Sequence, residues 1–197
     1  MQRHVSDPYV QASKRDGYRS RASYKLLELQ DKYKLLKKGM KVVDLGAAPG
    51  GWSQVANELI SPSGQVWALD LLPIAPIPRV HCIQGDFNDE KIHQLLADTM
   101  GEDTTVDWVL SDLAPNLSGI RDLDEARSLE LLEMVWEFAS KHLKNKGGML
   151  VKVFEGNEAQ QYIKRVKQHF DQVLIRKPLA SRAESKEIYM LARGYNI

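Results

Sequence analysis

Four short apolar runs, each typical of a β-strand, close on an acidic residue: Asp44, Asp70, Asp86 and Asp112. Any one of these residues could be a helix cap or a turn former. In a parallel sheet, however, the carboxyl ends of the strands meet at one edge, where ligands bind. Four carboxylates at that edge would accept hydrogen bonds from a ligand that carries hydroxyl, amine and ammonium groups.

A lysine interrupts a fifth apolar run, residues 149–154. Lys152 would be costly to bury as an ammonium ion unless carboxylates accompany it. The simpler interpretation is a side chain that reaches from a strand end to solvent. A lysine balanced between burial and acidic neighbours can instead act as a base.

A glycine-rich turn, residues 46–51, joins the first apolar run to a segment compatible with a helix. Such a turn presents backbone N–H groups to a ligand, and its glycines permit close approach. A dinucleotide site would need the pattern G-x-G-x-x-G, but Ala48 holds the second glycine position and Pro49 follows. Together with Asp44, which suits a cationic amino group, the turn favours S-adenosylmethionine over NAD. An ordinary turn of small residues is the alternative.

The length of 197 residues suits one α/β domain. No apolar run has the length of a membrane span or the pattern of a signal peptide. Cys82 is the single cysteine, so no internal disulfide can form, and no Cys/His cluster has zinc-ligand spacing. These features predict a cytoplasmic protein with no membrane association and no metal.

Strand-like and helical patterns alternate along most of the chain, which predicts a doubly wound, mostly parallel seven-stranded sheet. Strands are expected at residues 41–44, 65–70, 80–86, 106–112, 149–154, 173–175 and 188–192. Helices are expected at residues 20–36, 53–60, 89–100, 129–143 and 159–170. The last two strands have no helical pattern between them, so one strand should be antiparallel. Residues 1–19 contain Asp-Pro and Asp-Gly steps and are expected to be an irregular basic arm, with a single domain over 20–197.

Four blocks resemble the signature blocks of the FtsJ family of RNA 2′-O-ribose methyltransferases. They are residues 20–26 (SRASYKL), 44–52 (DLGAAPGGW), 111–116 (SDLAPN) and 151–154 (VKVF). The blocks follow the family order, and the resemblance extends from about residue 7 to the C-terminus. It implies a Rossmann-like methyltransferase fold that uses S-adenosyl-L-methionine.

The resemblance also implies the site residues. The family's catalytic tetrad corresponds to Lys25, Asp112, Lys152 and Glu187, with Lys152 as general base. Glu187 alone would read as a solvated charge, and its role rests on the similarity of residues 185–189 (SKEIY) to the family's last block. With Asp44 and Gly46 of the turn, the implied cofactor contacts are Gly50, Trp52, Asp70, Asp86 and Asp112.

Charge points to a polyanionic partner. Residues 1–41 hold 11 Lys and Arg against 4 Asp and Glu, a net charge of +7, whereas the whole chain is +1. A solvated helix face is the alternative. Expected RNA contacts are Lys14, Arg15, Arg19, Arg21, Lys32, Lys34, Lys37 and Lys38.

Within the family, the N-terminus resembles the bacterial type that modifies a uridine of 23S rRNA in the large (50S) ribosomal subunit. We therefore expect a monomeric enzyme of that kind. The alternatives are methylation of tRNA or another RNA, and a non-catalytic ribosome-assembly or RNA-binding factor with the same fold. An NAD-dependent oxidoreductase is disfavoured by Ala48 and Pro49.

Overall fold

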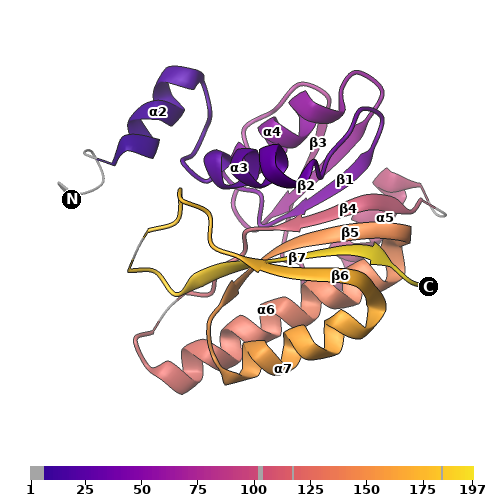
Figure 1. Ribbon diagram of the computed structural model, residues 1–197. Coiled ribbons are helices and arrows are strands. Elements are labelled where there is room, and N and C mark those ends of the chain that lie inside the picture. Colours follow the sequence, from indigo (N-terminus) through magenta and orange to yellow (C-terminus); the bar gives the residue numbers. More distant parts are fainter. Residues whose placement is uncertain (1–6, 102–103, 117, 183) are drawn as a thin grey trace.

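The computed structural model describes residues 7–101, 104–116, 118–182 and 184–197. Within them, seven strands form one sheet in the order β3-β2-β1-β4-β5-β7-β6 (Figure 1). The strands are β1 (Lys41–Leu45), β2 (Gln65–Asp70), β3 (Val80–Gln84), β4 (Val106–Ser111), β5 (Leu143–Phe154), β6 (Phe170–Arg176) and β7 (Glu187–Tyr195). Strand β7 is antiparallel to both of its neighbours, and the other pairings are parallel. The prediction of a doubly wound sheet with one antiparallel strand is confirmed.

Helices cover both faces of this sheet. They are α2 (Pro8–Asp16), α3 (Ser23–Tyr33), α4 (Gly51–Ile60), α5 (Glu90–Met100), α6 (Arg121–His142) and α7 (Asn157–Val166), followed by a short 3₁₀ turn, η1 (Lys167–His169). Helices α3 and α4 pack on one face and α5, α6 and α7 on the other, while α2 stands apart (Figure 1). None of the helices in the described ranges is both long and apolar enough to cross a membrane.

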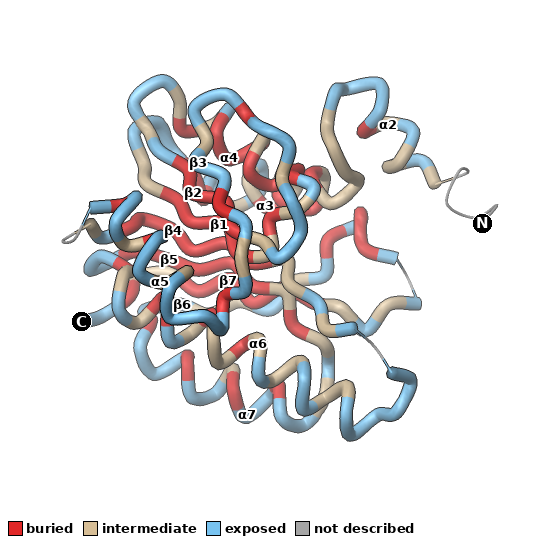
Figure 2. The backbone as a smooth tube through the Cα atoms, turned by 180° about the vertical axis from the view of Figure 1, so that it is seen from behind, coloured by how far each residue is buried: buried red, intermediate tan, exposed pale blue. Residues whose placement is uncertain are grey.

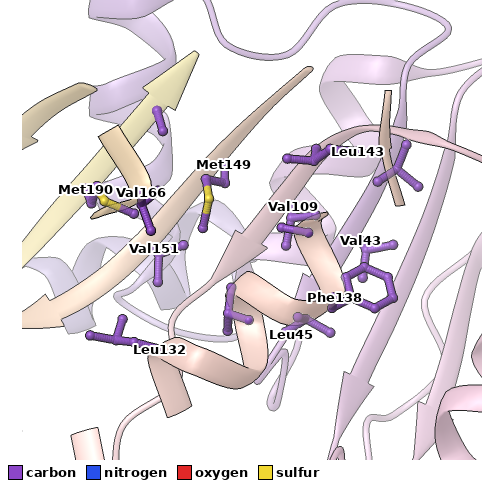
Figure 3. Close-up of a cluster of buried hydrophobic side chains, with 14 of the residues drawn as sticks. Val43, Leu45, Val109, Leu132, Phe138, Leu143, Met149, Val151, Val166 and Met190 are labelled. Carbon is purple, nitrogen blue, oxygen red and sulfur yellow. The ribbon is translucent and has the colours of Figure 1, made fainter. Parts of the chain in front are cut away.

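Each face of the sheet carries its own apolar core, and the strands between them are buried (Figure 2). On one face, Val43, Val109 and Met149 meet Leu132 and Phe138 of α6 (Figure 3). On the other face, side chains of α3 and α4 cover β1, β4 and β5, among them Leu26, Leu29, Trp52, Val55 and Ala56. Full burial of one such large side chain contributes roughly 1.5–3 kcal/mol, so these two layers hold the loops at the sheet edge in place.

The expectation of an irregular N-terminal arm is wrong for residues 8–16, which form α2. The residues that suggested a loop are its caps. The Asp7 carboxylate accepts a hydrogen bond from the Tyr9 N–H at 2.9 Å, and Gly17 ends the helix with φ of 80°. Residues 1–6 lie outside the described ranges.

Several boundaries differ from the prediction. Helix α3 ends at Tyr33 instead of residue 36, because Lys34 adopts a left-handed conformation with φ of 51°. Helix α6 begins at Arg121 instead of residue 129, and β5 begins at Leu143 instead of residue 149, so Gly147 and Gly148 lie inside this strand. A Cβ on Gly148 would lie 2.8 Å from the Trp108 ring and from the Ala192 carbonyl oxygen, so this glycine permits close strand packing.

Candidate active site

The glycine turn connects β1 to α4 at the carboxyl edge of the sheet and is held by its neighbours. The N–H groups of Gly46 and Ala47 donate to the Leu69 carbonyl at 2.9 and 3.1 Å. The Ala48 N–H donates to the Asp70 carboxylate at 2.9 Å. Asp70, predicted as a cofactor contact, therefore also fixes the shape of the turn.

Glycine is required at the turn's first position. Gly46 has φ of +76°, and a Cβ there would lie 2.5 Å from the Leu113 side chain. Leu113 directly follows Asp112, so the close contact joins the glycine turn to the end of β4. The two loops that carry the predicted cofactor and catalytic residues are thus packed against each other.

A cavity of about 130 Å³ lies beside this turn. It brings together three of the predicted cofactor residues, Gly46, Asp70 and Asp86. The other lining residues were not predicted: Leu45, Leu69, Leu71, Gly85, Phe87, Asn88, Leu113, Leu131 and Met134. Two carboxylates beside apolar walls suit the ribose hydroxyls and base of a nucleoside.

Asp44 is fully buried beneath the turn. Its Oδ2 accepts a hydrogen bond from the Ser53 hydroxyl at 2.6 Å, whereas no donor among the described residues reaches Oδ1. Burial raises the pKa of Asp44 to about 7; the Ser53 hydrogen bond opposes this rise, and the charges on Asp112 and Asp70 add to it. A buried carboxylate with an unused oxygen fits a cationic group of a ligand.

Gly50 and Trp52, also predicted as cofactor contacts, are buried behind the turn and do not line the cavity. Gly50 is the residue before α4 and has φ of 109°. The Trp52 indole donates to the Ala22 carbonyl at 2.8 Å, and its ring lies 5.8 Å from that of Tyr189. In this structure Trp52 connects α4 to the start of α3, and Gly50 lies against Ile77 and Arg19.

Strand pairing places the two predicted catalytic residues of the C-terminal half on one face. Lys152 of β5 pairs with Tyr189 of β7, and Phe154 pairs with Glu187. Alternation along β7 puts Glu187 and Tyr189 on the same side, beneath α3. Helix α3 adds Lys25 from its first turn, and Asp112 follows β4.

These side chains form two ion pairs. Lys152 Nζ lies 3.2 Å from Asp112 Oδ1, and Lys25 Nζ lies 2.7 Å from Glu187 Oε1. The side chains of Lys152 and Lys25 are only 8% and 9% exposed, so both ammonium groups depend on these carboxylates. The structure thus brings together all four residues that the family resemblance implied.

Tyr189 links these two ion pairs, and it was not predicted from the sequence. Lys25 Nζ donates to the Tyr189 hydroxyl at 2.9 Å, and that hydroxyl donates to Asp112 Oδ1 at 2.6 Å. Burial raises the pKa of Tyr189 far above its ordinary value, and the charges on Asp112 and Glu187 add to the rise. The hydroxyl therefore stays protonated. Its position two residues after Glu187 in an apolar strand was the available signal.

Two opposing influences act on the pKa of the Glu187 carboxyl. Burial raises its pKa, but the hydrogen bond and positive charge of Lys25 outweigh burial, and the net pKa is lowered. Glu187 is therefore ionised at neutral pH and forms the ion pair with Lys25.

A larger cavity, about 450 Å³, lies on the α6 and α7 side of Phe154. Its walls include Leu129, Leu132 and five acidic residues: Asp124, Glu125, Glu155, Glu158 and Glu184. Within the described ranges, no three His, Cys, Asp or Glu side chains are grouped as they would be for a metal ion. Arg121 and Lys186 also line this cavity, but the five carboxylates outnumber these two cations, which disfavours a phosphate group on this side of Lys152.

The predicted RNA-binding cations fall into two groups. Arg19 and Arg21 bind other parts of the protein: Arg21 pairs with Asp7 and donates to the Ala180 carbonyl in a partly buried position, and Arg19 donates to loop carbonyls at the surface. The remaining six are exposed: Lys14, Arg15, Lys32, Lys34, Lys37 and Lys38. Such contacts within the protein cannot be read from charge alone.

Comparison with known proteins agrees with this geometry. Residues 18–195 match the family model of FtsJ-like methyltransferases. The chain is 50% identical to a protein named ribosomal RNA large subunit methyltransferase E from Coxiella burnetii, over all of this chain and 95% of that one. It is 48% identical to the protein of the same name from Pseudomonas aeruginosa, over 99% of this chain and 94% of that one.

A solved structure shares the fold. The crystal structure of a ribosomal RNA methyltransferase from Plasmodium falciparum superposes with a TM-score of 0.80 at 29% identity, covering 90% of this chain and 98% of that one. The family match, the two relatives and this superposition all extend over nearly the whole chain. The chain therefore belongs to the family of FtsJ-like methyltransferases.

Proposed function

We propose that this chain transfers a methyl group from S-adenosylmethionine to the ribose 2′-hydroxyl of a uridine in 23S rRNA of the large ribosomal subunit. The names of its full-length relatives support the substrate class. The observation that carries the proposal is Lys152, buried and held by Asp112 beside the glycine turn. A noncatalytic binding module would have no use for that lysine.

The residues around the glycine turn fit the cofactor. S-adenosylmethionine supplies an activated methyl group on a sulfonium centre. Asp44 has the unused buried oxygen that suits its ammonium group, and Asp70 and Asp86 line the cavity that suits its nucleoside. Gly46 lets a ligand approach the backbone there. By the family resemblance, Gly50, Trp52 and Asp112 complete the set.

The linked side chains around Lys152 would orient the ribose 2′-hydroxyl and remove its proton. Lys152 Nζ, as the neutral amine, accepts the proton of the 2′-hydroxyl early or late in the transfer. Asp112 holds Lys152 at 3.2 Å, and the Tyr189 hydroxyl holds Asp112 in turn. Lys25, fixed by Glu187 and Tyr189, positions the ribose or a neighbouring phosphate. No step requires a metal.

RNA would approach from the side of the basic N-terminal segment. Residues 1–19 act as an arm on the methyltransferase domain of residues 20–197, and exposed cations such as Lys14 and Arg15 contact phosphates without reading sequence. The acidic cavity beyond Phe154 keeps phosphates away from the opposite side. The enzyme works as a cytoplasmic monomer on large-subunit rRNA.

Methyl transfer from labelled S-adenosylmethionine to purified large subunits that lack their own modifications tests this proposal. The wild type should label one ribose 2′-oxygen, mapped by nuclease digestion, and Lys152→Ala should lower the rate by about 10²–10⁴-fold. Labelling of tRNA and not of large subunits would mean that the substrate is tRNA and not 23S rRNA. RNA binding without transfer to any RNA would support the noncatalytic alternative, and equal rates in the variant would remove Lys152 from the mechanism.

A further inference from the structure

The Arg19 guanidinium lies between two loops that frame the cofactor cavity. Its Nη1 donates to the carbonyl of Pro49 in the glycine turn at 3.2 Å, and also to the carbonyl of Ala75. Its Nη2 donates to the carbonyl of Pro76 at 2.8 Å. One planar group thus joins the turn after β1 to the loop after β2.

The backbone around Arg19 is itself fixed on α4. The Arg19 N–H donates to the Gln54 side-chain oxygen at 2.9 Å, and the Gln54 amide nitrogen donates to the Gly17 carbonyl at 3.2 Å. A Cβ on Gly50 would lie 2.8 Å from Ile77 Cδ1 and 3.1 Å from Arg19 Nη1. The guanidinium, the turn and the loop therefore meet with no spare room.

Other elements hold both ends of the loop of residues 71–79: the Leu72 N–H donates to the Asp70 carboxylate at 2.8 Å, and the Pro78 carbonyl accepts from the Asn57 amide at 3.1 Å. Arg19 holds the middle of this loop. Pro73, Pro76 and Pro78 lack the N–H that could stabilise it through the backbone. Leu71 and Leu72 are 63% and 64% exposed, whereas Ile77 is 7% exposed and anchors the far end. Leu71, the first residue of the loop, lines the cofactor cavity next to Asp70 of β2, so the loop forms part of the cavity wall.

We propose that Arg19 is a positioning residue of the cofactor site and not a phosphate contact. Its fork of donors holds the glycine turn and the proline-rich loop at a fixed separation, which keeps the cavity open to the nucleoside. This inference rests on the proposed use of S-adenosylmethionine. It reassigns a cation that the charge pattern had placed among the RNA contacts.

Arg19→Lys separates the two roles, because lysine keeps the charge that a phosphate needs but lacks the planar fork. The matched control is Arg165→Lys, since Arg165 is exposed and pairs with Glu133. Calorimetric titration with S-adenosylhomocysteine, in the absence of RNA, should show affinity reduced about tenfold in Arg19→Lys and unchanged in Arg165→Lys. In turnover assays the KM for S-adenosylmethionine should rise, while the KM for RNA stays within about twofold of wild type.

Amide hydrogen exchange provides a second measurement on the same proteins. In Arg19→Lys, exchange should accelerate in the peptides that cover residues 71–80 and stay unchanged in the β4–β5 core. Normal cofactor affinity with a raised RNA KM would overturn the proposal in favour of a phosphate contact. Global acceleration would reduce Arg19 to a general stabilising residue. If the wild type itself fails to bind S-adenosylhomocysteine, the proposed function fails instead.

Discussion

The two ends of α3 carry the same kind of charge in opposite surroundings. At its first turn, Lys25 is buried at the carboxyl edge of the sheet, paired with Glu187 and Tyr189. Beyond its last turn, Lys37 and Lys38 are exposed at the amino edge, where the chain enters β1. The first lysine is fixed by carboxylates and the others are solvated. Position in the fold, more than charge, therefore decides which cations can take part in catalysis.

The largest effect is expected at the buried end. Lys25→Met keeps the apolar stem but removes the charge, so the rate should fall by roughly 10²–10³-fold. Leaving Glu187 buried and unpaired should also lower the free energy of unfolding by about 3–5 kcal/mol. Lys37→Met is the matched control and should change neither quantity.

Chemical denaturation and methyl-transfer kinetics on a double variant separate stability from catalysis. Lys25→Met combined with Glu187→Gln should recover most of the lost free energy of unfolding, because the unpaired charge is gone. The rate should stay low. Recovery of the rate together with stability would mean that Lys25 has only a structural role.

The next effect is expected at Tyr189, where phenylalanine keeps the packing against Trp52 but removes the hydroxyl. Loss of two hydrogen bonds, one to Lys25 and one to Asp112, should lower kcat by roughly 10–100-fold with little change in either KM. The pH–rate profile should shift, because both charged partners lose the same neutral bridge. An unchanged profile with a lowered melting temperature would reduce Tyr189 to a packing residue.

How far the sequence could predict this arrangement depends on whether a residue acts locally or across the fold. The strands and the glycine turn follow from local apolar runs and breakers, and the structure has β2 at residues 65–70 as expected. The prediction that Asp7 and Gly17 are loop residues is wrong, because the residue types that are common in loops also cap helices. The contacts of Arg19 and Tyr189 involve partners far away in the sequence, which no spacing pattern can reveal.

Burial affects an acid, Asp44, as well as Lys25 of α3. Its pKa is raised to about 7 from an ordinary 3.8, so the folded chain holds a proton that the unfolded chain has lost. The free energy of unfolding should therefore fall as pH rises from about 4 to about 7 and then level off. A cationic ligand group favours the ionised carboxylate, so cofactor affinity should rise over the same interval.

Urea denaturation and S-adenosylhomocysteine titration at pH values from 5 to 8 check both slopes. Asp44→Asn should remove the Asp44 contribution to the pH dependence of both the free energy of unfolding and the cofactor affinity. The difference between this variant and the wild type separates the effect of Asp44 from that of other acids. Binding at pH 6 should release protons in the wild type, seen as a dependence of the binding heat on buffer ionisation enthalpy. Parallel curves for the two proteins would mean that Asp44 is ionised throughout.

The smallest effect is expected at the exposed end of α3. Both Lys37 and Lys38 lie at the edge of the sheet opposite to Lys152, so replacing them with glutamine should change kcat by less than about twofold. If RNA extends across this face, the slope of log affinity against log salt should fall by about one for each lost phosphate contact. Binding measured at several salt concentrations, with Lys14→Gln as a comparison at the catalytic edge, decides the matter. A changed slope at Lys14 alone would confine the RNA to the edge that carries the proposed catalytic residues and would leave the charge at the other end of α3 as solvated surface.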